Sequence, residues 1–320
     1  METQEKFPQT LQEAISYFSD PDQCFEYAVN LRWPDGKITC PRCGSDQHSF
    51  ISTRRLWFCK NCKRQFTMKV QTIFEDSPLG MDKWMAALWL LVNCKNGISS
   101  CEVARDLGVT QKTAWFMLHR LRLAMQTGSF GKLGGEVEVD ETFIGGKARY
   151  MHLYKKNLKD IKPGAKGKTA VMGILKRGGE VRTAVLYNRR KKIIQKEVKK
   201  HVEVGTALFS DSLPSYEGLN AEYAHEVIDH AIGYVNGKIH TNGLENFWSL
   251  LKRSLKGTYV SVEPFHLFRY LDEQTYRFNN RKELSDSERF ESVMGRVLNR
   301  RLTFKQLTGK EECPTRFFGA

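Results

Sequence analysis

The most regular alternation of apolar and polar residues lies in residues 134–147, GGEVEVDETFIGGK. Side chains alternate between the two faces of a strand, so this pattern predicts a strand with Val137 and Val139 on one face. Asp140 is expected on the opposite face near the end of the strand, with Glu138 two residues before it. The sequence therefore places an acidic side chain where a strand gives way to a glycine-rich turn.

Downstream of this stretch, strand-like and helix-like patterns follow one another. The predicted strands are Gly135–Ile144, Thr169–Leu175, Glu180–Tyr187, Ala207–Ser210 and Glu226–Ile228, and the predicted helices are Lys191–Val202 and one that follows Asn242. Three successive strands, followed by helices and strands in turn, are the order of an RNase H-like α/β domain with a mixed sheet. We assign that domain to residues 134–262.

Upstream of residue 126 the pattern is mostly helical. Short helices are expected over Thr10–Phe18 and Asp22–Arg32, within an N-terminal segment of residues 1–35, and an apolar helix over Met81–Asn93. The loop Gln126–Gly135 is rich in glycine and short polar residues, which is typical of a domain boundary. The fold class expected for the whole chain is α+β multidomain.

Two Cys-x-x-Cys pairs lie in the segment 36–70. Cys40 and Cys43 form the first pair, Cys59 and Cys62 form the second, and 15 residues lie between the pairs. This spacing is typical of a zinc ribbon, in which each pair brings two thiolates to one Zn²⁺ and a hairpin returns the second pair to the first. Four thiolates leave no open coordination position for water, so this zinc is expected to be structural.

Residues 71–126 contain the layout of a helix-turn-helix. A short helix from Ser100 ends at Gly108, and Thr110 is placed to cap a second helix that continues to Met125. In such a motif the N-terminal part of the second helix approaches the bases in the major groove of double-stranded DNA. The candidate base-contacting residues are Gln111, Lys112 and Thr113. A packed helical hairpin without DNA contacts is the alternative interpretation.

The chain is strongly basic, because 50 Lys+Arg against 36 Asp+Glu give a net charge of +14. The excess is concentrated between Phe143 and Lys200, where 18 Lys and Arg accompany three acids, a net +15. Such a surface favours a polyanion as partner, with a solvated basic surface as the alternative. The basic residues expected to contact DNA phosphates are Arg189, Arg190, Lys191 and Lys192.

The sequence contains no apolar run that approaches the roughly 20 residues of a membrane helix, so we expect no membrane partner. The N-terminus lacks the charged-then-apolar order of a secretory signal. A cytoplasmic, reducing compartment is therefore expected, with the protein associated with the nucleoid when it binds DNA.

Two further stretches carry acids that can join Asp140 at one site. ALFSDSLPSY is an apolar run that reaches Asp211, and HTNGLENFWSLLKRSLKGTY is an amphipathic helix pattern that carries Glu245. Lys252 lies two helical turns after Glu245 and shares its face. Asn242 precedes the helix and is expected to cap it, with a role as an oxygen ligand as the alternative. Carboxylates beside basic residues suit a phosphodiester substrate, because carboxylates bind divalent metal and Lys and Arg bind the flanking phosphates.

In these motifs the sequence resembles bacterial insertion-sequence transposases that join a zinc ribbon and a helix-turn-helix to an RNase H-like DDE domain. The resemblance is carried by CPRC, CKNC, VDETFIGGK, LFSDSLPSY and HTNGLENFWSLLKRSLKGTY, which span roughly residues 20 to 280. By that similarity Asp140 and Asp211 fill the two aspartate positions. Glu245 fills the glutamate position, and Lys252 the basic position after it. Some relatives carry Asn as the third residue, which keeps Asn242 as the alternative.

The resemblance implies two-metal phosphoryl transfer. Mg²⁺ or Mn²⁺ ions held by Asp140, Asp211 and Glu245 would activate water to cut a strand at an element end, and then activate the freed 3′-hydroxyl to attack target DNA. The implied partners are double-stranded DNA, as element ends and target, and further copies of the chain in a homo-oligomer on DNA. The helical C-terminal segment 263–320, with runs at Phe265–Asn279 and Glu288–Arg301, is expected to hold DNA or a second subunit.

Two rival functions are also compatible with parts of the sequence. One is a catalytically inactive DNA-binding regulator, which is disfavoured because all three acidic positions are filled. The other is an RNase H-like nuclease or resolvase without strand transfer, with which the acids alone are compatible. A zinc ribbon and a helix-turn-helix favour the transposase, because a nuclease of general substrates needs no sequence reader.

Overall fold

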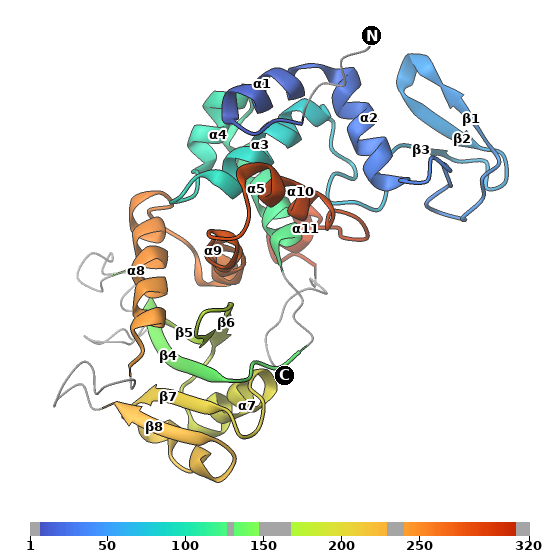
Figure 1. The fold of residues 1–320 in the computed structure, drawn as a ribbon. Coiled ribbons are helices and arrows are strands. Elements are labelled where there is room, and N and C mark those ends of the chain that lie inside the picture. The colour runs from blue at the N-terminus through green and yellow to red at the C-terminus, as the bar shows by residue number, and fades with distance from the viewer. Residues whose placement is uncertain (1–6, 127–130, 147–167, 229–239, 312–320) are drawn as a thin grey trace. The chain divides into compact units, whose positions relative to one another are not determined.

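The computed structural model describes residues 7–126, 131–146, 168–228 and 240–311. The chain forms two compact units, one of residues 1–126 with 280–319 and one of residues 127–279. The first unit contains α1 (Leu11–Ser19), α2 (Pro21–Arg32), β1 (His48–Ile51), η1 (Ser52–Arg54), β2 (Leu56–Cys59), β3 (Gln65–Phe66), α3 (Met81–Asn93), α4 (Ser100–Leu107), α5 (Gln111–Met125), α10 (Asp286–Met294) and α11 (Phe304–Leu307). Figure 1 labels its α-helices and β-strands. The second contains β4 (Glu136–Ile144), β5 (Thr169–Lys176), β6 (Val181–Leu186), α7 (Lys191–His201), β7 (Ala207–Asp211), η3 (Pro214–Tyr216), η4 (Leu219–Ala221), β8 (Ala224–Ile228), α8 (Asn242–Gly257), η5 (Pro264–His266) and most of α9 (Leu267–Asn280).

The zinc ribbon of the first unit is an antiparallel sheet in the order β1-β2-β3. Its small core is aromatic, because Trp57 stacks on Phe66 with 5.7 Å between ring centroids and meets Trp33 edge-on. Cys40 and Cys59 are buried against these rings. The aromatic rings and the cysteines together hold a fold that is too small to bury a conventional core.

The helical part of the first unit begins and ends its helices with the residues that the sequence indicates. Ser99 caps α4 in a capping box with Glu102, and Gly108 ends α4 in the left-handed conformation with φ 60°. Thr110 caps α5 by accepting a hydrogen bond from the backbone N–H of Thr113. The predicted helix-turn-helix layout of α4 and α5 is confirmed at the level of the backbone.

The C-terminal segment completes the core of the first unit. Phe290 of α10 lies 5.1 Å from the ring of Phe18 and 5.6 Å from that of Trp89, between ring centroids. The unit therefore takes up residues from both ends of the chain, whereas the sequence pattern predicted a separate C-terminal segment from residue 263. Burial of aromatic surface decides this arrangement, which no local pattern in residues 280–311 indicates.

The predicted helical run Glu288–Arg301 is wrong in its second half, because α10 ends at Met294. The chain then leaves the helix to pair with an earlier segment. Ile73 donates a backbone hydrogen bond to Val297, and Asn299 donates one to Gln71. These long-range backbone bonds replace the helical ones and end the helix.

The second unit is a five-stranded mixed sheet in the order β6-β5-β4-β7-β8. The strands β4, β5 and β6 are antiparallel neighbours, and β7 and β8 run parallel to β4. This order and these directions are those of the RNase H-like sheet, so the predicted fold class is confirmed. The chain order of three strands and then alternating helices and strands is what fixes this topology.

Helices cover both faces of the sheet (Figure 1). On one face Val137 and Val139 of β4 pack with Ile194 and Val198 of α7. On the other face the buried residues of β5 pack with those of α8 and α9, namely Val171 and Leu175 with Leu244, Phe247, Trp248, Leu251, Leu267 and Leu271. The acids of β4 that alternate with its valines therefore point toward the α8 face. Within the described residues, no helix has the length and apolar character needed to cross a membrane.

Candidate active site and zinc ribbon

The pairing of β4 with β7 leads toward Asp140 and Asp211. The strands β4 and β7 are parallel, with Glu136 opposite Ala207 and Glu138 opposite Phe209. Asp140 and Asp211 each lie two residues beyond this last pair, and the charge of Asp211 contributes to the raised pKa of Asp140. Because the register is the same on both strands, the two carboxylates also share the face that α8 covers.

Trp248 of α8 holds Asp140 in place. Its indole N–H donates a hydrogen bond of 2.9 Å to Oδ2 of Asp140, and the backbone N–H of Glu141 donates one of 2.8 Å to Oδ1. Gly173 of β5 lies opposite Asp140 in the ladder. A Cβ at Gly173 would lie 2.6 Å from the Trp248 ring, so the absence of a side chain at Gly173 makes room for the indole that bonds to Asp140.

Glu138 attaches the start of α8 to the sheet. It is 1% exposed, and its Oε2 accepts a hydrogen bond of 3.0 Å from the backbone N–H of Leu244 in the first turn of α8. Its other oxygen accepts one of 3.0 Å from Nε of Arg177 and lies 3.4 Å from Nδ1 of His240. A strand carboxylate therefore does the work of a helix cap and stabilises the positive end of the helix dipole.

The predicted capping role of Asn242 is therefore wrong. Asn242 is the first residue of α8, exposed to solvent, and Thr241 occupies the cap position without a side-chain cap hydrogen bond. The physical reason is that Glu138 already supplies the acceptor that an Asn cap would supply. Gly243 permits this approach, because a Cβ there would lie 2.8 Å from Oε2 of Glu138.

The carboxylates around Asp140 repel one another. Burial, together with the charges of Asp211 and Glu245, raises the pKa of Asp140 to about 6, against an ordinary 3.8. Glu245 is exposed on α8, as is Lys252 two turns later. Asp211 is half-buried, and its Oδ1 accepts a hydrogen bond of 3.2 Å from the backbone N–H of Leu213. A divalent cation would relieve this repulsion, so the donor set and its charge fit such an ion.

A fourth carboxylate, Glu141, lies on the opposite face of β4. Burial, together with the charges of Asp211 and Asp140, raises the pKa of Glu141 to about 7. The hydroxyl of buried Tyr216 donates a hydrogen bond to Oε1 of Glu141. The nearby guanidinium of Arg189 opposes the rise in pKa. Alternation along the strand assigns Glu141 to the core side, and only the tertiary contacts with η3 reveal its pairing.

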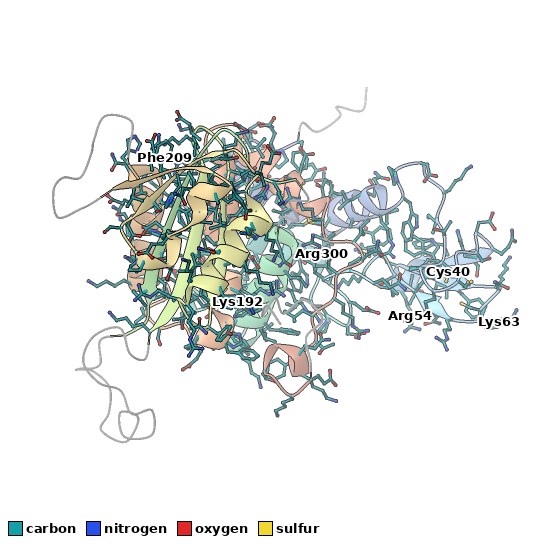
Figure 2. The ribbon with its side chains drawn as sticks, turned by 90° about the horizontal axis from the view of Figure 1, so that it is seen from below. Cys40, Arg54, Lys63, Lys192, Phe209 and Arg300 are labelled. Carbon is teal, nitrogen blue, oxygen red and sulfur yellow. The ribbon has the colours of Figure 1, made fainter. Side chains whose placement is uncertain are left out.

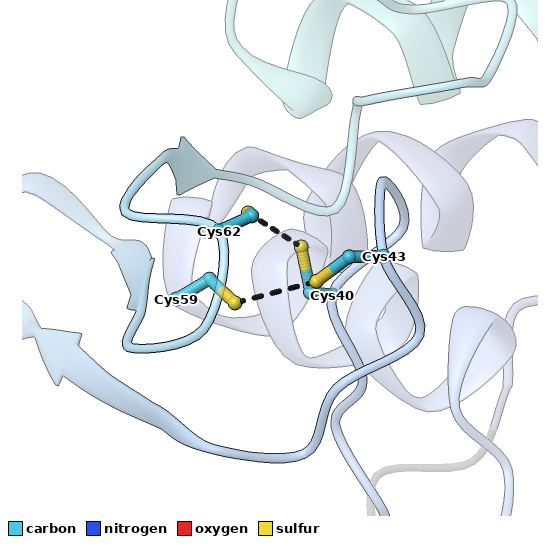
Figure 3. A group of neighbouring side chains, drawn as sticks. All are labelled: Cys40, Cys43, Cys59 and Cys62. Atoms are coloured by element: carbon cyan, nitrogen blue, oxygen red, sulfur yellow. Dashed lines mark hydrogen bonds between the residues drawn. The ribbon is translucent and has the colours of Figure 1, made fainter.

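The four cysteines of the ribbon converge as a tetrathiolate site (Figure 3). Sγ of Cys40 lies 3.8 Å from that of Cys62, and Sγ of Cys43 lies 3.6 Å from that of Cys59. A tetrahedral Zn²⁺ with bonds of about 2.3 Å to sulfur requires sulfur separations of about 3.8 Å. The backbone N–H of Cys62 lowers the pKa of Cys59 to about 7, whereas burial raises the pKa of Cys62 to about 11. These four residues therefore fit a structural zinc.

Among the described residues, the cysteines are the only group of three or more potential ligands whose ligand atoms all lie within 4.8 Å of one another. The carboxylates of Asp140, Asp211 and Glu245 therefore lie farther from one another than the cysteine sulfurs do. Mutual repulsion of like charges is a sufficient physical reason for such spacing.

Comparison with known proteins assigns the family. Residues 132–279 match the family described as ISXO2-like transposase domain, of the IS1595 type. Residues 19–65 match the IS1595 family described as transposase zinc-ribbon domain. Together the two matches identify an insertion-sequence transposase with an N-terminal zinc ribbon. The first match spans the candidate acidic site, and the second spans the four cysteines.

Two further similarities accompany this assignment. Over 254 residues the transposase is 25% identical to an uncharacterized protein in transposable element ISH50 of Halobacterium salinarum, which covers 75% of this chain and 85% of that protein. A chain in the crystal structure of a pre-cleavage Mos1 transpososome is 15% identical, and the match covers 66% of this chain and 77% of that chain with a TM-score of 0.22. A TM-score this low does not establish a common fold, so the assignment rests on the two family matches.

The basic residues of the transposase that were expected to contact phosphates lie at the start of α7. Arg189 and Arg190 precede the helix, Lys191 and Lys192 begin it, and all four are exposed (Figure 2, Lys192). The Arg189 guanidinium lies over the Phe143 ring, 4.6 Å from its centroid. The four cationic side chains lie at the N-terminal end of the helix, which is also the positive end of the helix dipole. Their charges and the dipole together favour binding of an anion there.

The three residues expected to read bases lie at the start of α5. Gln111 and Lys112 are exposed and Thr113 is half-buried. Nε2 of Gln111 donates a hydrogen bond of 2.8 Å to the hydroxyl of Ser100, and Nζ of Lys112 lies 4.9 Å from the centroid of the Phe304 ring. Both side chains thus already have partners within the first unit, which orient them.

Several residues that position this site were not singled out from the sequence. They are Glu138, Glu141, Gly173, Arg177, Tyr216 and the indole N–H of Trp248. The available signal was the isolated glycine inside the predicted strand Thr169–Leu175, which indicates a close approach of another element. The remaining residues have partners far away in the sequence, and a local pattern does not encode such partners.

Proposed function

We propose that this transposase cuts DNA strands at the ends of an insertion sequence and joins the freed ends to target DNA by metal-dependent phosphoryl transfer at Asp140, Asp211 and Glu245. The observation that carries the proposal is the shared register of β4 and β7, which supports a pair of carboxylates on one face of the sheet. The charge of Glu245 acts on the pKa of Asp140 from α8, which supports the third position.

Divalent metal fits the chemistry of these residues. Asp140, Asp211 and Glu245 supply hard oxygen donors, and burial, with a lesser contribution from the charges of Asp211 and Glu245, raises the pKa of Asp140. Bound Mg²⁺ or Mn²⁺ ions would supply Lewis-acid stabilisation of the attacking and leaving oxygens during phosphoryl transfer. Trp248 fixes the orientation of Asp140, and Glu138 fixes the start of the helix that carries Glu245.

Basic residues hold the DNA in this proposal. Lys252 shares a helix face with Glu245, and its ammonium group binds a phosphate beside the scissile bond. The four basic residues at the start of α7, Arg189, Arg190, Lys191 and Lys192, bind the phosphates of the flanking strand. Gln111, Lys112 and Thr113 of α5 read bases at the element ends.

The reaction also sets the partners and the place of action. Two element ends must meet one target, so we propose that copies of the chain assemble as a homo-oligomer on double-stranded DNA. We place the reaction in the cytoplasm, on nucleoid DNA. The zinc ribbon takes no part in the chemistry, since four thiolates leave no open position for water.

The test is single-turnover cleavage of a pre-bound element end in Mg²⁺ by two variants. Glu245→Gln removes the charge and keeps the shape, so we expect loss of cleavage with end binding intact. Asn242→Ala removes an exposed first-turn side chain, so we expect cleavage to continue and stability to change by less than about 0.5 kcal/mol.

Three outcomes are informative. An active Glu245→Gln beside an inactive but folded Asn242→Ala would transfer the third position to Asn242. Cleavage without joining of the 3′ end to a target plasmid would indicate a nuclease or resolvase. Binding without any cleavage by the parent protein in Mg²⁺ or Mn²⁺ would indicate an inactive regulator.

A further inference from the structure

Tyr187, between β6 and α7, is an aromatic side chain that the fold leaves almost entirely in solvent. It is 75% exposed, and among the described residues it stacks on no other ring. Phe50, the other exposed aromatic side chain among the large hydrophobics of the described residues, packs instead against Phe25 and Trp57. Within the part of the chain that the structure describes, the ring face of Tyr187 thus has no stacking partner.

The loop that carries Tyr187 is held by specific hydrogen bonds. Oδ1 of Asn188 accepts a hydrogen bond of 3.0 Å from the backbone N–H of Arg190, which closes a tight turn directly after Tyr187. The hydroxyl of Ser215 donates one of 2.8 Å to the carbonyl of Arg189. Since Ser215 belongs to η3, which follows Asp211, the loop is tied to the segment that leaves the candidate active site.

The sheet topology brings this loop to the edge where the acidic strands end. The strand β6 runs antiparallel to β5, and β5 runs antiparallel to β4, so β6 and β4 point the same way. Leu186 and Phe143 both pair with Ala170, so the last residue of β6 is level with the end of β4. Tyr187 therefore leaves the sheet at the edge where β4 ends, four residues beyond Thr183, which is level with Asp140.

The neighbours of Tyr187 are cationic. Arg189, Arg190, Lys191 and Lys192 follow within five residues, and no ion pair occupies them among the described residues. Arg189 also reaches toward the acids, since it lies over Phe143 and its charge lowers the pKa of Glu141. An exposed ring beside cations that bind phosphates is the arrangement with which proteins hold an unpaired nucleotide, where the base stacks and the backbone is neutralised.

We infer that Tyr187 is a stacking platform for one unpaired nucleobase of the DNA strand that is cut. This inference rests on the proposed function, because it assumes that the strand runs along the edge of the sheet past Asp140. Stacking tolerates any base, so Tyr187 contributes to holding the opened end and not to reading its sequence. Unpairing the end bases costs less once one of them has a ring on which to stack.

The experiment places 2-aminopurine at successive positions on either side of the cleavage site and records its emission when the Asp140→Asn protein, which binds without cutting, is added. We expect one position at which emission differs between this protein and its Tyr187→Ala derivative. The Tyr187→Phe derivative should behave like the parent, because it keeps the ring and loses only the hydroxyl. End affinity should fall about 5-fold or more for Tyr187→Ala.

A matched control separates base contacts from phosphate contacts. Arg190→Gln should reduce the dependence of log affinity on log salt by about 1 and leave the emission pattern unchanged, whereas Tyr187→Ala should keep the salt dependence. The inference is overturned if Tyr187→Ala matches the parent in affinity and in emission at every position. Failure of the proposed function would look different, because either the parent protein would not cleave the element end in Mg²⁺ or Mn²⁺, or the Asp140→Asn protein would still cleave it.

Discussion

At the scale of single residues, Asp140 is a buried carboxyl group whose ionisation lowers the stability of the folded protein. Burial and the charges of Asp211 and Glu245 raise the pKa of Asp140 to about 6. An acid whose pKa is higher in the folded state than in the unfolded state binds more protons when folded, so its ionisation costs stability. That cost is absent below pH about 4, grows as the pH rises toward 6, and is fully present above it.

Asp140→Asn is therefore expected to stabilise the protein in magnesium-free buffer. At pH 8 the gain should be on the order of 1 to 2 kcal/mol, allowing for solvent screening, and it should narrow as the pH falls from about 7 toward 4. Thermal melts at several pH values measure it. Added Mg²⁺ should raise the melting temperature of the parent protein but not that of Asp140→Asn. Equal melting temperatures of the two proteins at pH 8 without Mg²⁺ would contradict a stability cost from ionised Asp140.

At the scale of elements, the close contact between α8 and β5 places the candidate catalytic helix. Gly173 is the point of contact, because its missing side chain makes room for Trp248 and Leu244. Glu138 then fixes the start of the helix from the neighbouring strand. The same two contacts that pack the core also aim the indole N–H at Asp140.

Gly173→Ala is expected to force the helix away from the sheet. Overpacking of this kind typically costs about 1–3 kcal/mol, and the hydrogen bond between Trp248 and Asp140 should weaken with it. Urea unfolding measures the first effect, and the cleavage rate of element ends measures the second. Gly257→Ala is the matched control, because a Cβ there meets nothing within 4 Å, and it should lower neither quantity.

The elements α5 and α7 should contribute differently to DNA binding. Replacing Arg189, Arg190, Lys191 and Lys192 by Gln should weaken binding to all sequences and reduce the salt slope by up to about 3.6, if each residue contacts one phosphate. Replacing Gln111 and Lys112 by Ala should instead reduce the preference for element ends over random DNA. Binding titrations at several salt concentrations separate the two effects, and an unchanged slope in the first variant would contradict the phosphate contacts.

At the scale of the whole molecule, the zinc ribbon is the part whose stability depends on metal. Cys40→Ser removes one of four ligands, so zinc content should fall below one ion per chain and the ribbon should unfold, with loss of end binding. Cys101→Ser is the control, because Cys101 is exposed on α4 and lies outside the cluster. Two results would contradict a structural zinc site: a purified parent protein without zinc, or a Cys40→Ser protein with the same melting temperature as the parent protein.

The first compact unit depends on both ends of the chain. Phe290→Ala removes the ring that packs on Phe18 and Trp89, so it should destabilise this unit by about 3–5 kcal/mol. The fragment 127–279 lacks the contact of Phe290 with Phe18 and Trp89. Its unfolding in urea should therefore match the unfolding of residues 127–279 in a urea titration of the full chain. If Phe290→Ala leaves the melting of the full chain unchanged, α10 does not belong to the core of this unit.

The sequence by itself determined the features that depend on near neighbours. Alternation predicted β4 and the face of Asp140, cysteine spacing predicted the ribbon, and Ser99, Gly108 and Thr110 marked the helix ends. The motifs in their order also indicated the transposase family that the comparisons confirm. These features are readable because backbone geometry and metal coordination act over a few residues.

Only the tertiary structure decided which distant residues meet. The charge of Asp211 acts on Asp140 because the parallel strands β4 and β7 pair with each other, in a register that is set by the packing of both faces of the sheet. Asn242 is not the cap of α8, since a carboxylate from β4 reaches the helix first. The residues after 280 join the N-terminal core because Phe290 buries its ring there. In each case burial or hydrogen bonding between segments far apart in the chain stabilises the contact. Local sequence patterns do not indicate which distant residues will pair.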